Sequence, residues 1–152
     1  MPFHITITRS KSFEKRLSKD ETEKILCYID KFIRDKSGKN IDKTDYSLRY
    51  KGSTSYFNWN ILRAVDKGVF RIEEDGFQSK ITYEYFMYQL FIVVPIMGIG
   101  FWIFSGSYLG FLLCVGWLGG MNWLITVIRH GSMFNEITEG IDTLFIELKN
   151  NK

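Results

Sequence analysis

The chain has 152 residues and a formal net charge of +3, and 24% of its residues are charged while 45% are hydrophobic. The charges are unevenly placed, because residues 85–128 contain no Asp, Glu, Lys or Arg, whereas residues 1–82 contain 17 of the 20 basic and 12 of the 17 acidic residues. This division excludes a soluble monomer, a multidomain enzyme and a disulfide-stapled secreted module, and it predicts a membrane protein that carries a small polar domain.

The type and placement of the polar residues argue against nucleic acid, metals and cofactors. Basic and acidic residues alternate along the first half of the chain, which is typical of a solvated surface rather than of a cationic face. The two cysteines and the two histidines have no ligand spacing, so we expect no metal and no cofactor. The amino terminus lacks a basic segment followed by an apolar one, so we expect the polar domain to stay in the cytosol.

The polar domain begins with signals for a strand and a helix. Residues 3–8 alternate between apolar and polar side chains, which is the period of a half-buried strand. Ser18 and Glu21 have the spacing of a capping box, apolar residues then recur at helical spacing, and Gly38 lies where a helix is expected to end. We therefore predict a helix over residues 19–36.

Further strands are predicted around a polar turn and around the Asp75-Gly76 pair, which predicts a type I′ hairpin. Their ranges are 46–50, 56–59, 69–74 and 77–83. The predicted fold class is therefore an α+β membrane protein, whose cytoplasmic domain at residues 1–82 has about five strands and one helix. The last strand leads into the apolar region without a Gly, Pro or Ser linker, which predicts a stiff junction.

Two transmembrane helices are predicted at residues 83–104 and 108–128, joined by a short extracytoplasmic turn at residues 105–107. Each apolar stretch is about the 20 residues that a helix needs to cross a bilayer. Basic residues flank the outer ends of the pair, while the turn is uncharged. The positive-inside rule therefore places both termini in the cytoplasm. We expect the hairpin to lie in the inner (plasma) membrane.

Small and polar residues in the apolar region predict how the hairpin packs. Two GxxxG pairs allow close helix approach, and Gln89 and Asn122 are expected to bond across the helix pair near its cytoplasmic end. One small-residue face suffices for the hairpin itself, so the second predicts a homo-oligomer or a larger membrane protein partner. The two pairs are Gly106 with Gly110 and Gly116 with Gly120.

A C-terminal cytoplasmic helix is predicted over residues 129–152, with Ser132 as its cap. Its apolar stripe can pack on the sheet, lie in the membrane interface or dock on a partner. The acidic polar face argues against a membrane-surface helix, so we favour protein packing, within the chain first. The stripe, also a candidate partner-docking surface, consists of Phe134, Ile137, Ile141, Leu144, Phe145 and Leu148.

One segment of the polar domain has the composition of a ligand site. A turn with hydroxyls, backbone N–H groups and cations could hold a phosphate, and aromatic residues after it could stack a base. A plain hairpin loop with core aromatics is the alternative, because the segment lacks the P-loop frame. The candidate ligand-binding residues are Arg49, Lys51, Gly52, Ser53, Thr54, Tyr56 and Trp59.

Two functions follow from these patterns, and neither is enzymatic, because no catalytic companions surround the histidines and no carboxylate, Lys or His lies in the membrane interior. The first is a non-catalytic accessory or interaction subunit that binds through its cytoplasmic domain and C-terminal helix. The alternative is a ligand-gated, oligomerising membrane effector or pore whose domain senses a small anionic ligand, such as a nucleotide.

Overall fold

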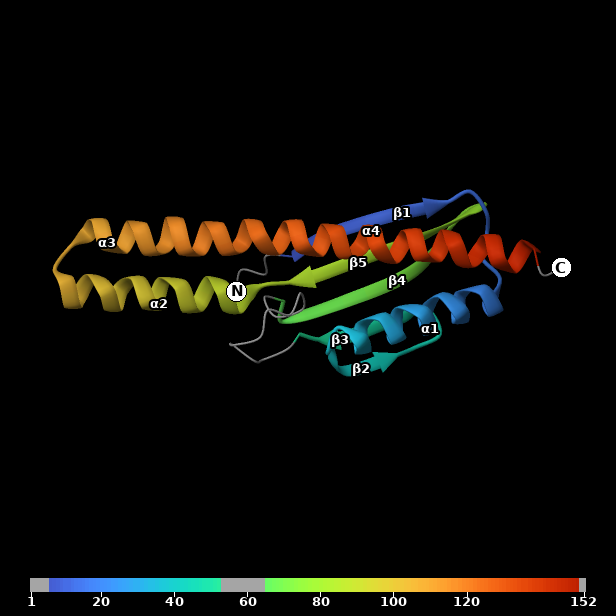
Figure 1. Cartoon of the computed structure of the whole chain (residues 1–152), viewed down its shortest axis with the longest axis horizontal. Coiled ribbons are helices and arrows are strands. Elements are labelled where there is room, and N and C mark those ends of the chain that lie inside the picture. Colours follow the sequence, from blue (N-terminus) through green and yellow to red (C-terminus); the bar gives the residue numbers. More distant parts are fainter. Residues whose placement is uncertain (1–5, 53–64, 151–152) are drawn as a thin grey trace.

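The structure, a computed structural model, describes residues 6–52 and 65–150. A five-stranded antiparallel sheet, in the strand order β1-β5-β4-β3-β2, lies beside helices, and a long helical hairpin extends from one end (Figure 1). This confirms the mixed α and β class, and four of the five observed strands overlap predicted ones. The strands are β1 Thr6–Phe13, β2 Lys39–Lys43, β3 Ser47–Lys51, β4 Lys67–Asp75 and β5 Gln78–Phe86.

Strand β2 was not predicted, because its five residues contain a single large apolar side chain, Ile41. The strand also carries a register shift between Lys39 and Asp42, where Asn40 has a φ of 48°. Such a bulge breaks the alternation that sequence patterns detect. The strand predicted at residues 56–59 lies outside the described residues.

The turn between β4 and β5 is correctly located, but its predicted type is wrong. Asp75 pairs with Gln78, so the two central residues are Gly76 and Phe77 rather than Asp75 and Gly76. Of these two, only Gly76 has a positive φ, of 63°. A type I′ turn needs positive φ at both central positions, whereas glycine at the first position alone is typical of type II′.

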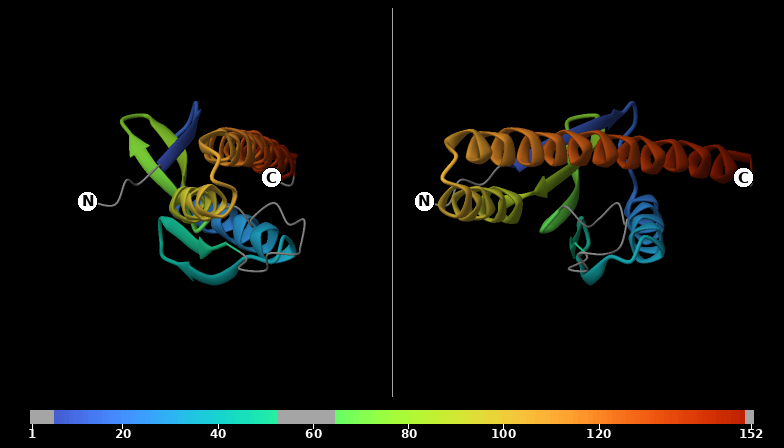
Figure 2. Two further views of the ribbon diagram at one scale, coloured as in Figure 1. Left: turned by 90° about the vertical axis from the view of Figure 1, so that its left-hand side faces the viewer. Right: turned by 60° about the vertical axis from the view of Figure 1, so that its left-hand side comes forward.

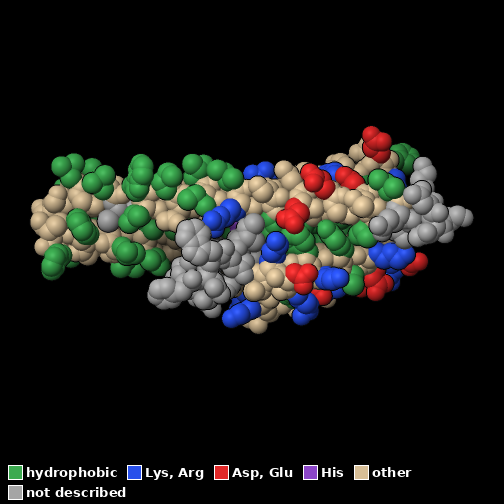
Figure 3. Space-filling view, viewed as in Figure 1, with side chains coloured by type: hydrophobic (Ala, Val, Ile, Leu, Met, Phe, Trp, Pro, Cys, Tyr) green, Lys and Arg blue, Asp and Glu red, His purple; other side chains and the backbone are tan. Residues whose placement is uncertain are grey.

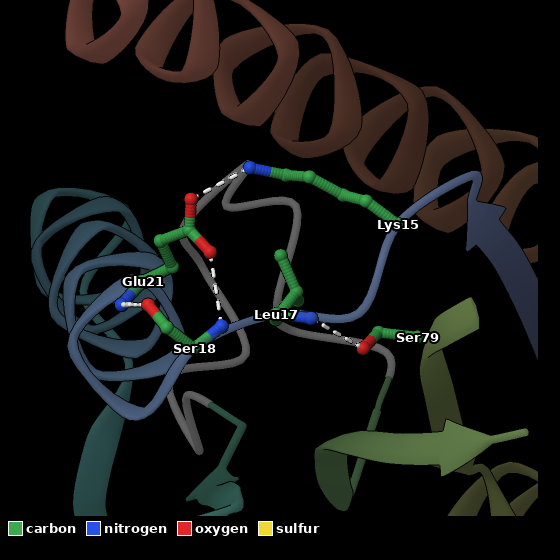
Figure 4. A network of polar contacts seen from close by, with 5 residues as sticks. All are labelled: Lys15, Leu17, Ser18, Glu21 and Ser79. Carbon is green, nitrogen blue, oxygen red and sulfur yellow. Dashed lines mark hydrogen bonds and ion pairs between the residues drawn. The ribbon is translucent and has the colours of Figure 1, made fainter. Parts of the chain in front are cut away.

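Helix α1, Lys19–Asp35, begins and ends almost where the sequence predicts. Its capping box is complete, because the Glu21 N–H donates to the Ser18 hydroxyl and the Ser18 N–H donates to the Glu21 carboxylate (Figure 4). Lys15 also pairs with Glu21 at 2.6 Å. The Leu17 N–H donates to the hydroxyl of Ser79 on β5, which ties the start of the helix to the sheet.

The domain has two layers, the sheet and a layer formed by α1 and the helix α4, Gly120–Asn150 (Figure 2). One sheet face, the inner face, contacts these helices and supplies most of the buried residues of the sheet. The opposite, outer face is covered by no helix or strand within the described residues. The core combines Leu48, Phe70, Ile81 and Tyr83 of the sheet with Ile25, Leu26, Ile29 and Ile33 of α1 and Met133, Ile137 and Ile141 of α4.

The helical hairpin consists of α2, Tyr88–Ser105, and a second helical stretch formed by α3, Tyr108–Leu113, the π-helical turn η1, Cys114–Gly119, and α4. Gly106 ends α2 in the left-handed conformation, with φ 67°, as the predicted turn requires. Both stretches are long and apolar enough to cross a membrane, and only 6% of the residues in the apolar segment of each are buried. On the face shown in Figure 3, hydrophobic side chains gather along the hairpin, and the charged side chains gather on the other half.

Strand β5 is longer than predicted and changes the start of the first apolar helix. It runs to Phe86, and α2 begins at Tyr88 rather than at residue 83. Tyr83 and Tyr85, at the start of the predicted transmembrane helix, are instead fully buried on the inner face of the sheet. Cross-strand pairing with β1 and β4 holds these residues in the extended conformation, and a single-sequence pattern does not reveal that pairing.

The predicted cap at Ser132 is also wrong, because α4 passes through this position without interruption. The second apolar stretch and the C-terminal amphipathic helix are one helix that reaches from the hairpin across the whole sheet (Figure 1). A residue with capping chemistry starts a helix only where the chain is not already helical, and residues 120–131 are helical before it.

Candidate functional site

The amphipathic stripe of α4 is buried within the chain, which is the first of the three options left by the sequence. Phe134, Ile137 and Ile141 are at most 5% exposed and belong to the core. Phe145 packs edge-on against Phe13 of β1, with ring centroids 5.6 Å apart. Leu144 is half-buried, and the side chain of Leu148 lies outside the described part of the chain. Phe134, Ile137, Ile141 and Phe145 are therefore packed on the core and do not offer a free docking surface.

Two of the candidate ligand residues lie together on one face of the sheet. Arg49 and Lys51 are exposed on the outer face of β3, while Tyr50 between them points into the core. Gly52 is buried, and its N–H donates to the Asp66 carbonyl at 3.3 Å. Ser53, Thr54, Tyr56 and Trp59 lie outside the described residues. The structure thus brings together two cations of this set on one open face.

The glycines of the hairpin divide into contact and open positions. A Cβ on Gly110 would collide with the ring of Phe101, and one on Gly98 would lie 3.0 Å from the ring of Phe111. Gly119 approaches Val94 in the same way. The hairpin therefore packs through Gly98, Gly110 and Gly119, of which the sequence predicted only Gly110.

The other predicted packing glycines do not face the partner helix. A Cβ on Gly116 or Gly120 would meet nothing within 4 Å, and Gly106 serves the turn rather than a helix contact. The π-helical turn Cys114–Gly119 lies within this stretch, and its wider winding changes which side chains face α2. The second GxxxG pair is an open face of the hairpin.

Gln89 and Asn122 were predicted to bond across the helix pair, and this prediction is wrong. The Asn122 amide donates to the carbonyl of Leu118 in its own helix, at 2.7 Å. The backbone N–H of Gln89 donates to the carboxylate of Asp66 at 3.0 Å. Asp66 precedes β4 and so caps α2 from another part of the chain, which replaces a local cap that Met87 cannot supply.

Sequence reasoning missed a buried polar cluster where the hairpin meets the domain, which we call the junction cluster: Tyr50, Tyr83, Tyr85 and His130. The hydroxyls of Tyr50 and Tyr83 are 2.5 Å apart, and the Tyr83 hydroxyl lies 2.7 Å from Nδ1 of His130. Tyr85 stacks on the His130 ring, with centroids 4.8 Å apart. This chain of hydrogen bonds joins β3, β5 and α4.

Close backbone contacts fix the junction cluster in place. The ring of Tyr50 lies across Gly68 on β4, so that a Cβ on Gly68 would overlap with it. On the other side, the Arg9 guanidinium of β1 covers Gly131, where a Cβ would lie 2.7 Å from Nη2. Glycine at these two positions lets a large side chain cross the backbone of the neighbouring element.

The electrostatics of the junction cluster favour neutral hydroxyls. Burial raises the pKa of Tyr83 well above its usual value, and the neighbouring Tyr50 raises it further. Burial likewise raises the pKa of Tyr50 and of Tyr85, the latter despite the nearby charge of Arg9. Tyr50, Tyr83 and His130 are at most 1% exposed. Closed to solvent and with neutral hydroxyls, the tyrosines suit the joining of structural elements better than nucleophilic or acid–base chemistry.

A signal for the junction cluster is present in the sequence, although it is weak. Tyr83 and Tyr85 stand two residues apart on a strand, and His130 comes two residues after the uncharged stretch ends. No local sequence pattern indicates that Tyr83, Tyr85 and His130 contact one another. Within residues 6–52 and 65–150, no three His, Cys, Asp or Glu residues form a metal-like group.

Comparison with protein-family models, with curated proteins and with solved structures finds no match for this chain.

Proposed function

We propose that this protein is a non-catalytic, two-span protein of the inner (plasma) membrane that acts as an interaction subunit. The domain and the C-terminal half of α4 lie on the cytoplasmic side, and the turn at Gly106 lies on the opposite side. The uncharged hairpin, its exposed apolar side chains and the basic residues at its base support this arrangement.

The observation that carries the proposal is the continuity of α4. One helix forms the second apolar stretch and the docking helix of the domain, and His130 joins it to β5 at the point of transition. Asp66 caps α2 beside it, so both connections between domain and hairpin are tied by side chains. The domain is thereby held in one orientation to the bilayer, which suits a subunit that presents a surface at the membrane.

We place the partner-facing surface on the hairpin rather than on the C-terminal stripe. The stripe is buried by the sheet, whereas Gly116 and Gly120 have no neighbour within 4 Å. Helices in lipid associate through small residues that let backbones approach closely. We expect the open Gly116 and Gly120 face to contact a second copy or another membrane subunit.

The membrane arrangement is tested by cysteine labelling in a background with Cys27→Ser and Cys114→Ser. A cysteine at Ser107, in the turn, should react with a membrane-impermeant maleimide added to intact cells. A cysteine at Ser10, on the outer sheet face, should react only after the membrane is permeabilised. Equal labelling of both from outside, or release of the protein by alkaline carbonate, would contradict the proposal.

The association is tested by Gly116→Leu, with Gly100→Leu on α2 as the matched control, because neither residue has a neighbour within 4 Å. The stoichiometry of gently extracted protein, measured by native mass spectrometry, should fall for Gly116→Leu and stay at the wild-type value for Gly100→Leu. A monomeric wild type without a protein partner would reject the interaction subunit.

A second candidate, the ligand-gated effector, is favoured by one observation. Tyr50 stands between the exposed Arg49 and Lys51, and its hydroxyl begins the hydrogen-bond chain to His130 on α4. An anion bound at β3 would therefore act on a strand whose Tyr50 is linked through Tyr83 to His130 on α4. This candidate predicts that a nucleotide changes membrane leakage, and that Arg49→Gln abolishes the change.

A further inference from the structure

The outer face of the sheet carries an unusual row of side chains at the end nearest the hairpin. Lys39 pairs with Lys51, Lys51 pairs with Lys67, and Lys67 pairs with Phe86. Residues paired directly across antiparallel strands point to the same face. Three lysines on adjacent strands thus stand side by side, and with strands about 4.8 Å apart the row spans about 10 Å.

The lysine row, Lys39, Lys51 and Lys67, has no ion-pair partner within the described part of the chain. All three side chains are exposed, and none takes part in an ion pair there. Like charges placed directly opposite each other destabilise a sheet. Asp66, the adjacent acid, accepts the N–H of Gln89 and forms no ion pair with the row. A counter-charge from outside the domain would relieve the repulsion within the row.

The other rows of the outer face mix charges of both signs. Arg49 pairs across with Asp42, and Glu73 pairs across with Lys80. Arg71 and Glu84 form an ion pair at 3.1 Å. A uniformly cationic row therefore occurs at one level of this face, and that level is the one beside the hairpin.

The position of the row relates it to the bilayer. Phe86, the cross-strand partner of Lys67, comes two residues before α2 begins, and the Lys67 ammonium lies 5.7 Å from the centre of its ring. The end of β5 meets the start of α2 (Figure 1). A half-exposed Phe ring beside a lysine, at the start of an apolar helix, suits the place where protein meets lipid headgroups.

We propose that the lysine row binds the phosphate groups of anionic lipids in the bilayer that holds the hairpin. The inference rests on the proposed membrane arrangement and names a ligand for it. Flexible lysine side chains reach toward a charged surface while their stems remain on the sheet. The row would hold the hairpin end of the sheet at the headgroups and add a contact to the two covalent connections at the hairpin.

The experiment uses the full-length protein, extracted into mixed micelles with equal amounts of phosphatidylglycerol and phosphatidylcholine. Native mass spectrometry counts the retained lipids of each kind. Three variants are compared with the wild type. The first is Lys39→Gln/Lys51→Gln/Lys67→Gln, the second replaces the same residues with Arg, and the control is Lys19→Gln/Lys24→Gln/Lys31→Gln. The control changes charge equally, through three exposed lysines of α1.

We expect the wild type to retain phosphatidylglycerol preferentially, with each lysine of the row contributing up to about a fivefold preference. The triple Gln variant should retain the two lipids nearly equally, while the Arg variant and the α1 control should keep the preference. An unchanged preference in the triple Gln variant, or an equal loss in the α1 control, would overturn the proposal.

Two further measurements distinguish lipid binding from the binding of a soluble anion and from a failure of the membrane arrangement. Inorganic phosphate and ATP are added to the delipidated protein, and an adduct that the triple Gln variant lacks, without a lipid preference, would assign the row to a soluble anion and overturn the proposal. Alkaline carbonate extraction separates this inference from the proposed function. Protein that stays in the membrane but shows no lipid preference contradicts the lipid site alone, whereas protein that is released contradicts both.

Discussion

The Tyr83 hydroxyl of β5 lies 2.7 Å from Nδ1 of His130, two residues after the last residue of the uncharged stretch. This contact joins the strand that enters the hairpin to the helix that leaves it. Both side chains are fully buried, and the hydroxyl of Tyr50 also lies within hydrogen-bond distance of Tyr83. Tyr83 is therefore the central member of the junction cluster.

Tyr83→Phe should destabilise the protein by about 1–3 kcal/mol, because it leaves polar groups of Tyr50 and His130 buried without the hydroxyl that they share. Tyr46→Phe is the control, since Tyr46 is 51% exposed. Thermal unfolding of the detergent-solubilised protein should show a lower Tm for Tyr83→Phe only. Equal Tm values for the two variants would mean that the junction cluster contributes little.

Gly110→Ala and Gly116→Ala form a matched pair in the hairpin. The Cβ of the first collides with the Phe101 ring, while that of the second meets no atom within 4 Å. We expect Gly110→Ala to separate the two helices and cost about 1–3 kcal/mol, as overpacking does, and Gly116→Ala to leave the hairpin intact. The yield of a cysteine cross-link between α2 and α3 measures the difference, and an equal yield would contradict the observed packing.

The Asp66→Asn variant should gain stability relative to the wild type as the pH rises. Burial raises the pKa of Asp66, and the N–H groups of Gln89 and Tyr88 offset this only in part. A raised carboxyl pKa means that its contribution to stability is present below the usual pKa and is lost as the pH rises through the folded-state value. The Asn oxygen can still accept from Gln89 without a charge. Unfolding followed from acid to neutral pH tests this, and a constant difference from wild type would contradict it.

Glu21→Gln should show the opposite pH dependence. Burial raises the pKa of Glu21, but hydrogen bonds from Lys15 and from the N–H of Ser18 together outweigh it and leave the pKa lowered. The stability that the ionised group contributes is present above its usual pKa and is lost as the pH falls. The variant should be less stable than wild type at neutral pH and nearly equal to it in acid. A deficit that persists in acid would indicate that the charge is not responsible.

Local signals in the sequence predicted individual elements with small errors. The capping box located the start of α1, because its hydrogen bonds join residues three apart. The apolar spacing in α4 identified residues that the structure buries. By contrast, the packing glycines were mostly misassigned. A GxxxG pair indicates that a close approach is allowed, but the rotation of the helix decides whether a neighbour is there.

By itself the sequence determined where charge is absent, where the hairpin turns and which part of α4 is apolar, since each depends on residues within one or two helical turns. Only the tertiary structure decided that β5 extends to Phe86, that α4 continues through Ser132, and that Tyr50, Tyr83 and His130 meet. It also decided that Lys39, Lys51 and Lys67 form one row. These features depend on strand register and helix docking, which join residues far apart in the chain, and the energy of such contacts exists only when both partners are in place.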